Sequence, residues 1–156
     1  MTTTTAETGR RFIQQQLDDK RHLPGALLPI LHAIQDELGH IPPTAVPDIA
    51  EALNLSRAEV HGVISYYHHF RSEPARAHVV QVCRAEACQA MGGEALWAHA
   101  CGKTKGADVT LEPVYCLGLC ATAPAMSIDD KPFARVGAAK FDHLMTQLRA
   151  QQKEAA

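Results

Sequence analysis

The sequence lacks several features that would assign it to a large functional class. No run of Lys or Arg is dense enough to follow a phosphate backbone, and the formal net charge is -2, so nucleic-acid binding is disfavoured. The longest apolar stretches, such as residues 25–31 and 60–67, are too short to cross a bilayer, so we expect no direct membrane insertion. Residues 1–10 have neither the basic start nor the apolar core of a secretory signal, which predicts a cytoplasmic protein.

The chain also lacks a Cys-x-x-Cys pair, which argues against a thioredoxin-type dithiol catalyst. It does contain five cysteines, an odd number, in a protein expected to stay in a reducing compartment. Such thiols are more often metal ligands, catalytic groups or buried side chains than disulfides. The length of 156 residues suits one ordinary domain or two small ones, each able to bury a core.

The apolar residues of the first half, from Arg10 to about Phe70, recur at helical spacing. An apolar stripe over residues 27–38 predicts an amphipathic helix that ends at Gly39, a residue typical of helix C-termini. Two prolines then interrupt the chain. We expect Thr44 to cap the next helix, which runs to about residue 53.

A capping box is indicated by Ser56 and Glu59, because each side chain can accept a hydrogen bond from a free backbone amide at a helix start. The sequence therefore predicts another helix over about residues 57–67. The polar stretch 71–76 contains a proline and separates the helical pattern from a mixed one. We predict a helical region over residues 1–74 and a second domain over residues 75–156.

The second half alternates strand-like and helix-like segments, in the order β-α-β-β-β-α. A parallel strand pair joined by a right-handed helical crossover, then a hairpin and a closing helix, is the thioredoxin-like arrangement. The predicted fold is therefore α/β, an N-terminal helical bundle followed by a thioredoxin-like domain. The predicted strands cover residues 77–82, 109–115, 125–128 and 133–136, with a turn at 129–132, and the predicted helices cover residues 94–101 and 138–150.

Four of the cysteines form two pairs. Four residues separate Cys83 from Cys88, three separate Cys116 from Cys120, and each pair directly follows a predicted strand. If those strands are neighbours, the loops after them lie side by side and present four thiolates to one centre. One pair per iron of a 2Fe-2S cluster is the natural arrangement, and Gly118 between the second pair leaves room for backbone amides near the sulfurs.

A structural zinc ion is the alternative, because tetrahedral four-thiolate sites also use paired cysteines. Zinc sites more often use Cys-x-x-Cys at both ends, so spacing and strand context favour iron and sulfide, but the pattern is compatible with both metals. The alternative function is accordingly a zinc-stabilised interaction module without redox chemistry.

The sequence resembles the small 2Fe-2S subunit of respiratory complex I and its relatives in NAD-reducing hydrogenases and NAD-dependent formate dehydrogenases. The similarity spans roughly residues 27–148 and is carried by three stretches. These are LLPILHAIQDELGHIPPTAVPDIAEALNLSRAEVHGVISYYHHF in the first half, and VQVCRAEAC and YCLGLCATAPAMSID in the second.

The resemblance implies that Cys83, Cys88, Cys116 and Cys120 are the cluster ligands and that the second domain is a thioredoxin-like 2Fe-2S ferredoxin. It implies a one-electron carrier with two kinds of partner, an FMN- and NAD-binding flavoprotein subunit and a larger catalytic subunit for the other substrate. Only 27 residues separate the two pairs, fewer than is usual in the complex I subunit. This favours the compact gamma-type subunit of a soluble NAD-dependent formate dehydrogenase.

Other polar groups are expected to lie outside the site. Cys101 follows apolar residues in a predicted helix, which favours a buried free thiol. His61, His68 and His69 match none of the usual catalytic histidine motifs, which favours a surface role. Arg84 follows the first ligand, where it is either a charge near the cluster or a plain surface arginine.

Overall fold

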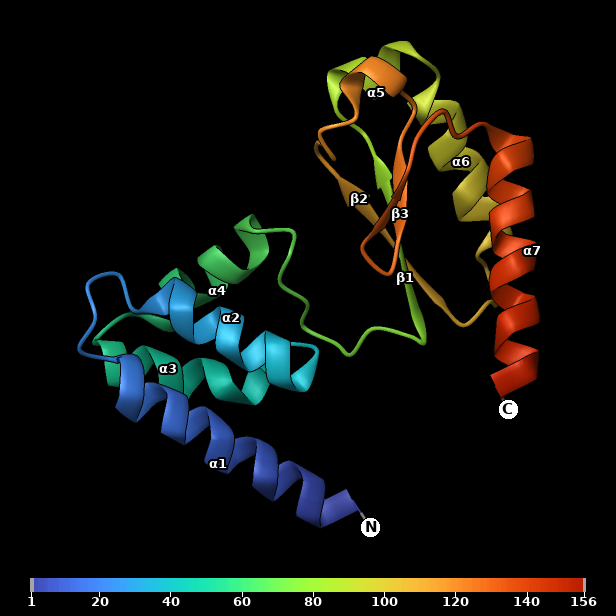
Figure 1. Ribbon diagram of the computed structural model, residues 1–156. Coiled ribbons are helices and arrows are strands. Elements are labelled where there is room, and N and C mark those ends of the chain that lie inside the picture. The colour runs from blue at the N-terminus through green and yellow to red at the C-terminus, as the bar shows by residue number, and fades with distance from the viewer. Residues whose placement is uncertain (1, 156) are drawn as a thin grey trace. The chain divides into compact units, whose positions relative to one another are not determined.

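The computed structural model describes residues 2–155, and the side chains of residues 7–151 (Figure 1). The chain forms two compact units, one up to Ala75 and the other from Arg76 onward. No helix within residues 2–155 combines the length and the apolar character needed to cross a membrane.

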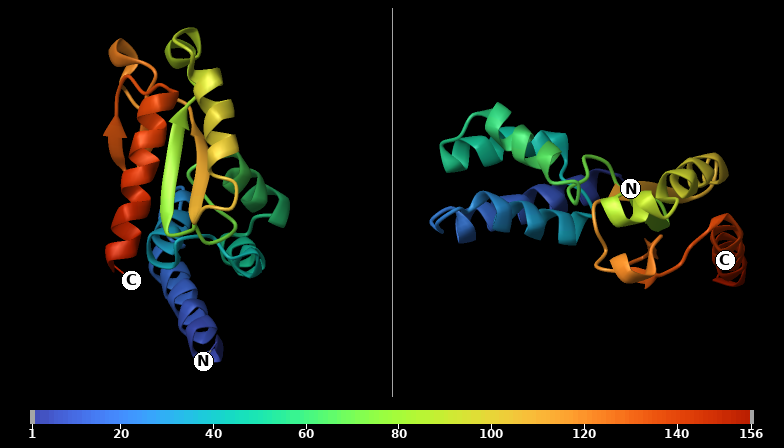
Figure 2. Two further views of the ribbon diagram at one scale, coloured as in Figure 1. Left: turned by 90° about the vertical axis from the view of Figure 1, so that its right-hand side faces the viewer. Right: turned by 90° about the horizontal axis from the view of Figure 1, so that it is seen from above.

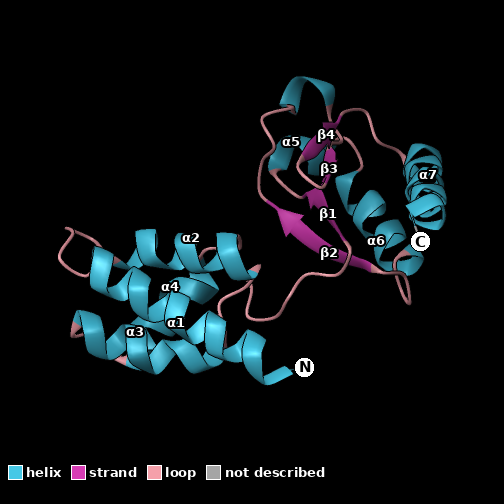
Figure 3. Ribbon diagram, turned by 60° about the horizontal axis from the view of Figure 1, so that its bottom comes forward, coloured by secondary structure: helices cyan, strands magenta, loops and turns pink. Residues whose placement is uncertain are grey.

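The first unit is entirely helical (Figure 3). It consists of α1 (Thr2–Lys20), α2 (Leu27–Leu38), the 3-10 turn η1 (Pro43–Ala45), α3 (Val46–Leu53) and α4 (Arg57–Tyr66). One apolar face of each helix enters a common core, as the helical spacing predicts. The buried apolar residues of this core are Ile13, Leu17, Ala26, Ile30, Leu31, Ile34, Ile41, Ala45, Ile49, Ala50, Val60, Ile64 and Phe70.

Two of the predicted helix ends are confirmed. Gly39 closes α2 in the left-handed conformation with φ 75°, where its N–H donates to the Gln35 carbonyl. Ser56 and Glu59 form the predicted capping box, in which Glu59 N donates to Ser56 Oγ at 3.1 Å and Ser56 N donates to Glu59 Oε2 at 2.7 Å. Both ends therefore follow from local side-chain chemistry alone.

The prediction that Thr44 caps α3 is wrong. Thr44 lies inside η1, and the residue before α3 is Ala45, whose side chain makes no capping bond. Because the Ala45 N–H already donates to the Pro42 carbonyl at 2.9 Å, the backbone is already helical before α3 begins. A side-chain cap needs an extended residue at this point, and none is present.

The second unit is built on a four-stranded sheet with the order β2-β1-β3-β4. The strands are β1 (His78–Cys83), β2 (Val109–Val114), β3 (Met126–Ile128) and β4 (Lys131–Phe133). β1 and β2 are parallel, whereas β3 is antiparallel to β1 and to β4. The thioredoxin-like fold class predicted from the sequence is confirmed.

Helices α6 (Gly93–Lys103) and α7 (Ala138–Ala155) lie side by side over one face of this sheet (Figures 1 and 2). Apolar side chains fill the layer between them and the strands. The most buried are Val80, Val82, Ala100, Met126, Val136 and Phe141, each with 0% exposure.

Two local predictions fail in this unit. The last strand is Lys131–Phe133 rather than residues 133–136, because Asp129 and Asp130 alone make the turn. Their φ values of 47° and 66° are those of a two-residue hairpin turn, which brings the strand forward. The helix α5 (Glu86–Ala90) was not predicted from the sequence, because its five residues are too few to display a helical period.

Candidate metal centre

The four predicted ligands converge at one edge of the sheet. Cys83 is the last residue of β1, and Cys116 follows β2 by two positions. Because β1 and β2 are parallel, with Cys83 paired to Val114, both strands deliver their cysteines to the same edge. Cys88 lies in α5 and Cys120 begins the 3-10 turn η2 (Cys120–Thr122), and these two elements contact each other beyond the strand ends (Figure 1).

The expectation that both pairs lie on loops is therefore wrong in part. Cys83 belongs to β1, whose last residue is one position later than predicted, and Cys88 sits within α5. The strand and the short helix fix the backbone of the first pair more tightly than a loop does. Cys116 lies in the connection after β2, as predicted.

The two pairs differ in exposure. Cys83 and Cys88, here called the inner pair, are each 2% exposed and pack against Ala123 and Ala125. Cys116 and Cys120, here called the outer pair, are exposed. The centre thus has a dry side against the protein and an open side toward solvent.

The outer pair has the geometry of two ligands to one metal ion. The sulfurs of Cys116 and Cys120 lie 3.8 Å apart. Thiolates bound at about 2.3 Å on two corners of a tetrahedron stand about 3.8 Å apart. The outer pair matches that spacing.

The surroundings of the Cys83 sulfur favour its charged form. Burial raises the pKa of the Cys83 thiol, but bonds from the backbone of Ala85, the Cys88 thiol, and the backbone of Leu117 and Cys116 outweigh it, so the pKa lies below its usual value. Hydrogen bonds that favour the charged form have this effect. Cys83 is therefore prepared to serve as a thiolate, the form that binds metal.

Cys88 and Cys120 differ from Cys83, because their pKa values are raised. Burial is the main cause that raises the pKa of Cys88, followed by its hydrogen bond to Cys83, while the backbone of Ala125 lowers it. The pKa of Cys120 is raised chiefly by its hydrogen bond with Cys116. Metal binding requires the thiolate form, so a metal must displace these protons when it binds.

The outer connection has an unusual backbone. Cys116 has φ 114°, a value that residues other than glycine rarely adopt, and Gly118 has φ 73°. The Gly118 N–H donates to the Cys116 sulfur at 3.3 Å. Gly118 thus plays the part predicted for it, and the strained Cys116 is typical of a residue held in place by a functional site.

The donor set fits a 2Fe-2S centre. Two thiol pairs come from separate connections at the carboxyl ends of neighbouring parallel strands, and soft thiolates are the ligands that iron-sulfur clusters use. The Gly118 N–H, which donates to the Cys116 sulfur, is the kind of backbone donor that such clusters have.

The remaining candidates lie outside the four-thiol group. Cys101 is a free thiol in α6, as predicted, but it is half-buried rather than buried. His61, His68 and His69 are exposed, and the His69 ring stacks on His32 at 5.3 Å in the helical unit. Arg84 is engaged with Glu94 rather than with a ligand thiol.

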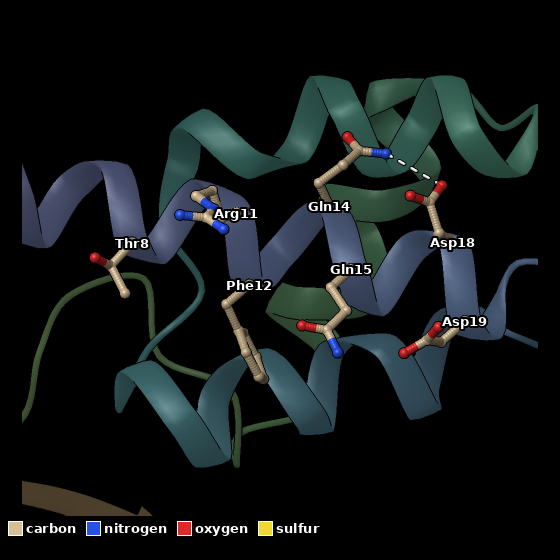
Figure 4. A pocket seen from close by; sticks show the side chains of 7 residues that line it. All are labelled: Thr8, Arg11, Phe12, Gln14, Gln15, Asp18 and Asp19. Carbon is tan, nitrogen blue, oxygen red and sulfur yellow. Dashed lines mark hydrogen bonds between the residues drawn. The ribbon is translucent and has the colours of Figure 1, made fainter.

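A hollow beside α1 offers no comparable chemistry (Figure 4). Only α1 side chains line it, and within the hollow Gln14 donates to Asp18 at 3.3 Å.

The sequence predicted the four thiols of the site but not the backbone groups of Ala85, Leu117 and Ala125 that affect their pKa values. Backbone donors leave no signal in the sequence, because any residue type can supply them.

Known proteins share this architecture. The chain is 33% identical over 135 residues to NADH-quinone oxidoreductase subunit 2 of Thermus thermophilus, covering 80% of this chain and 74% of the relative. It is 25% identical over 135 residues to the NADP-reducing hydrogenase subunit HndA of Solidesulfovibrio fructosivorans, covering 81% and 78%. The solved structure of an air-oxidized NAD+-reducing NiFe-hydrogenase superposes with a TM-score of 0.62 at 28% identity.

That superposition covers 85% of this chain but only 24% of the hydrogenase chain, so this protein corresponds to about a quarter of that polypeptide. Residues 13–149 match the family described as thioredoxin-like 2Fe-2S ferredoxin. The fold class and the cofactor predicted from the sequence are those of this family. The chain belongs to the thioredoxin-like 2Fe-2S ferredoxin family.

Proposed function

We propose that Cys83, Cys88, Cys116 and Cys120 hold one 2Fe-2S cluster, the inner pair on one iron and the outer pair on the other. The observation that carries this proposal is the meeting of two thiol pairs at the carboxyl ends of the parallel strands β1 and β2. The 3.8 Å separation of the outer sulfurs supports it. Family membership of residues 13–149 supports it independently.

The protein's own groups prepare this site. The amides directed at Cys83 favour its thiolate, and Ala123 and Ala125 exclude water from the inner pair. When bound, an all-cysteine 2Fe-2S cluster of the plant ferredoxin type accepts and returns one electron, near about -400 mV. Because Cys116 and Cys120 are exposed, the outer side is where an electron donor or acceptor can approach.

We infer that the chain is a one-electron carrier subunit that works beside a flavoprotein subunit with FMN and NAD(H). The relatives support this inference, because they are named as subunits of NADH-quinone oxidoreductase and of a NADP-reducing hydrogenase. Flavins exchange electrons singly or in pairs, so a one-electron carrier beside a flavin can divide the two electrons of a hydride.

NADH titration of the co-purified complex tests this role. If the carrier is in electronic contact with the flavoprotein, NADH bleaches the visible absorption of the cluster. The isolated chain, which has no flavin of its own in this scheme, should be bleached by dithionite but not by NADH. Bleaching of the isolated chain by NADH, or no bleaching in the complex, contradicts the proposed role.

Within this class we propose the gamma-type subunit of a cytoplasmic NAD-dependent formate dehydrogenase, with a larger formate-oxidising subunit as the second partner. The support is the short connection of 27 residues between the two cysteine pairs. The equivalent subunit of complex I or of an NAD-reducing hydrogenase is the second candidate, favoured by the names of the relatives.

The substrate of the co-purified complex separates these candidates. A tagged chain is purified with its partners, and NAD+ reduction is assayed with formate and with hydrogen, alongside NADH oxidation with a quinone. Formate-dependent NAD+ reduction supports the formate dehydrogenase. Activity with hydrogen or quinone alone assigns the chain to one of the other two complexes.

A further inference from the structure

Arg84, which directly follows the first inner cysteine, is held on three sides. Its N–H donates to the Val114 carbonyl at 2.8 Å, and its carbonyl accepts from Gln89 Nε2 at 3.0 Å. Its guanidinium makes two bonds to Glu94, of 3.1 and 2.8 Å, and lies 5.1 Å from the centre of the Trp97 ring. Arg84 therefore connects β2, α5 and the first turn of α6.

The first turn of α6 is also in close contact with Cys88, the second cysteine of the inner pair. A Cβ atom added to Gly93 would lie 2.6 Å from the carbonyl oxygen of Cys88 and 2.8 Å from its carbonyl carbon. Real Cβ atoms do not approach backbone this closely, so one of the two segments would have to move. Gly92, with φ 93°, makes the sharp bend that brings α6 to this position.

The pair of Arg84 and Glu94 does not act as a free charge beside the thiols. The bidentate geometry satisfies the guanidinium, and Glu94 is the main cause that raises the pKa of Arg84. What the pair does is join the segment after Cys83 to the helix that contacts Cys88. A mechanical role therefore fits the contacts better than an electrostatic one.

We propose that the first turn of α6 is the positioning element for Cys88, through the close contact of Gly93 and the ion pair of Glu94 with Arg84. Gly93 sets how near α6 comes to the Cys88 backbone, and the ion pair keeps it there. This inference rests on the proposed function, because it concerns the direction from which the Cys88 sulfur meets the cluster. We call them positioning residues because they act through the backbone of Cys88.

Gly93→Ala is the first test, with Gly102→Ala as its matched control. Both glycines lie in α6, but a Cβ at Gly102 meets no atom within 4 Å. We expect Gly93→Ala to lower cluster content after anaerobic reconstitution by about 10-fold, the scale of a disturbed outer-shell contact, or to change the EPR g-values. Gly102→Ala should match the wild type in both.

Glu94→Gln is the second test and does not insert an atom into the fold. Its control is Glu86→Gln, which removes the same charge two positions from Cys88 at an exposed site. We expect Glu94→Gln to release iron to a chelator several-fold faster than wild type and to shift the EPR signal and the reduction potential. Glu86→Gln should leave all three unchanged.

The outcomes separate this inference from the proposed function. A wild-type chain that binds no iron and sulfide overturns the proposed function, and this inference with it. If both Gly93→Ala and Glu94→Gln bind a cluster with the stability and the EPR spectrum of the wild type, this inference alone is overturned. If far-UV circular dichroism shows that Gly93→Ala does not fold, the comparison of Glu94→Gln with Glu86→Gln decides.

Discussion

The two units bury different kinds of core. The helical unit closes on aliphatic side chains, and Gln35 is a buried polar residue that binds backbone groups near the end of the unit. The second unit has an apolar layer between its sheet and two helices, and a separate group of thiols at the sheet edge. The first unit is therefore stabilised by apolar burial together with internal hydrogen bonds, whereas the edge of the second depends on what the thiols bind.

The largest expected effect is that of Cys88→Ser on the thiol group. The inner pair loses a soft ligand at a site with 2% exposure, where water cannot replace it, so we expect no stable 2Fe-2S cluster. Iron and sulfide analysis measures the loss. Cys101→Ser is the control and should keep the full cluster, because Cys101 lies in α6 outside the group. Loss of the cluster in Cys101→Ser contradicts the ligand assignment.

Phe141→Ala should break the apolar layer of the second unit. Phe141 is fully buried between α7 and the sheet, so the cavity is expected to cost about 3–5 kcal/mol of unfolding free energy. The protein has one tryptophan, Trp97 in α6, so its fluorescence reports denaturation of this unit. Leu144→Ala, at a half-buried site on the same helix, should cost clearly less. Equal losses would show that burial does not set the stability here.

Gln35→Leu should weaken the helical unit and leave the second unit unchanged. Gln35 is buried, donates to the His69 carbonyl and accepts from the Arg71 N–H at 2.7 Å. Its substitution removes both bonds to these part-buried backbone groups, at a cost of about 1–3 kcal/mol. Denaturation followed by circular dichroism should detect the change, while Trp97 fluorescence and cluster content stay at wild-type values. Gln15→Leu, at an exposed site on α1, is the control.

The smallest effect concerns the surface contact of Asp142 in α7 with His99 in α6. The hydrogen bond from His99 is the main cause that lowers the pKa of Asp142, and Lys103 adds to it. A carboxyl with a lowered folded-state pKa adds stability above its unfolded pKa and loses it as pH falls through the folded one. Asp142→Asn should therefore lower the fluorescence melting temperature slightly at pH 7 and not in strong acid. A deficit that persists in acid points to packing instead.

Many features of this fold can be predicted from local sequence patterns. The capping box at Ser56, the Gly39 helix end and the parallel strands that precede each cysteine pair all follow from residues near one another in the chain. Each depends on side-chain chemistry that acts over a few positions. The placement of the four thiols at one edge could be predicted only on the condition that the two strands are neighbours, and their parallel pairing meets that condition.

What the sequence did not reveal depends on backbone geometry and distant contacts. The five residues of α5 are too few to show a helical period in the sequence. The positive φ values of Asp129 and Asp130 give a two-residue turn, so the last strand begins earlier than predicted. The amides aimed at Cys83 come from two connections that meet only in the folded chain. The ion pair of Arg84 and Glu94 spans ten positions and has no recognised motif.

The central claim is that four thiols of this chain hold iron and sulfide. Anaerobically purified protein is analysed for iron, zinc and acid-labile sulfide, and its EPR spectrum is recorded at low temperature after reduction with dithionite. We expect a coloured protein with two irons and two sulfides per chain and a rhombic signal from a single unpaired electron. A colourless protein with one zinc ion per chain and no signal would contradict the claim and favour the interaction module.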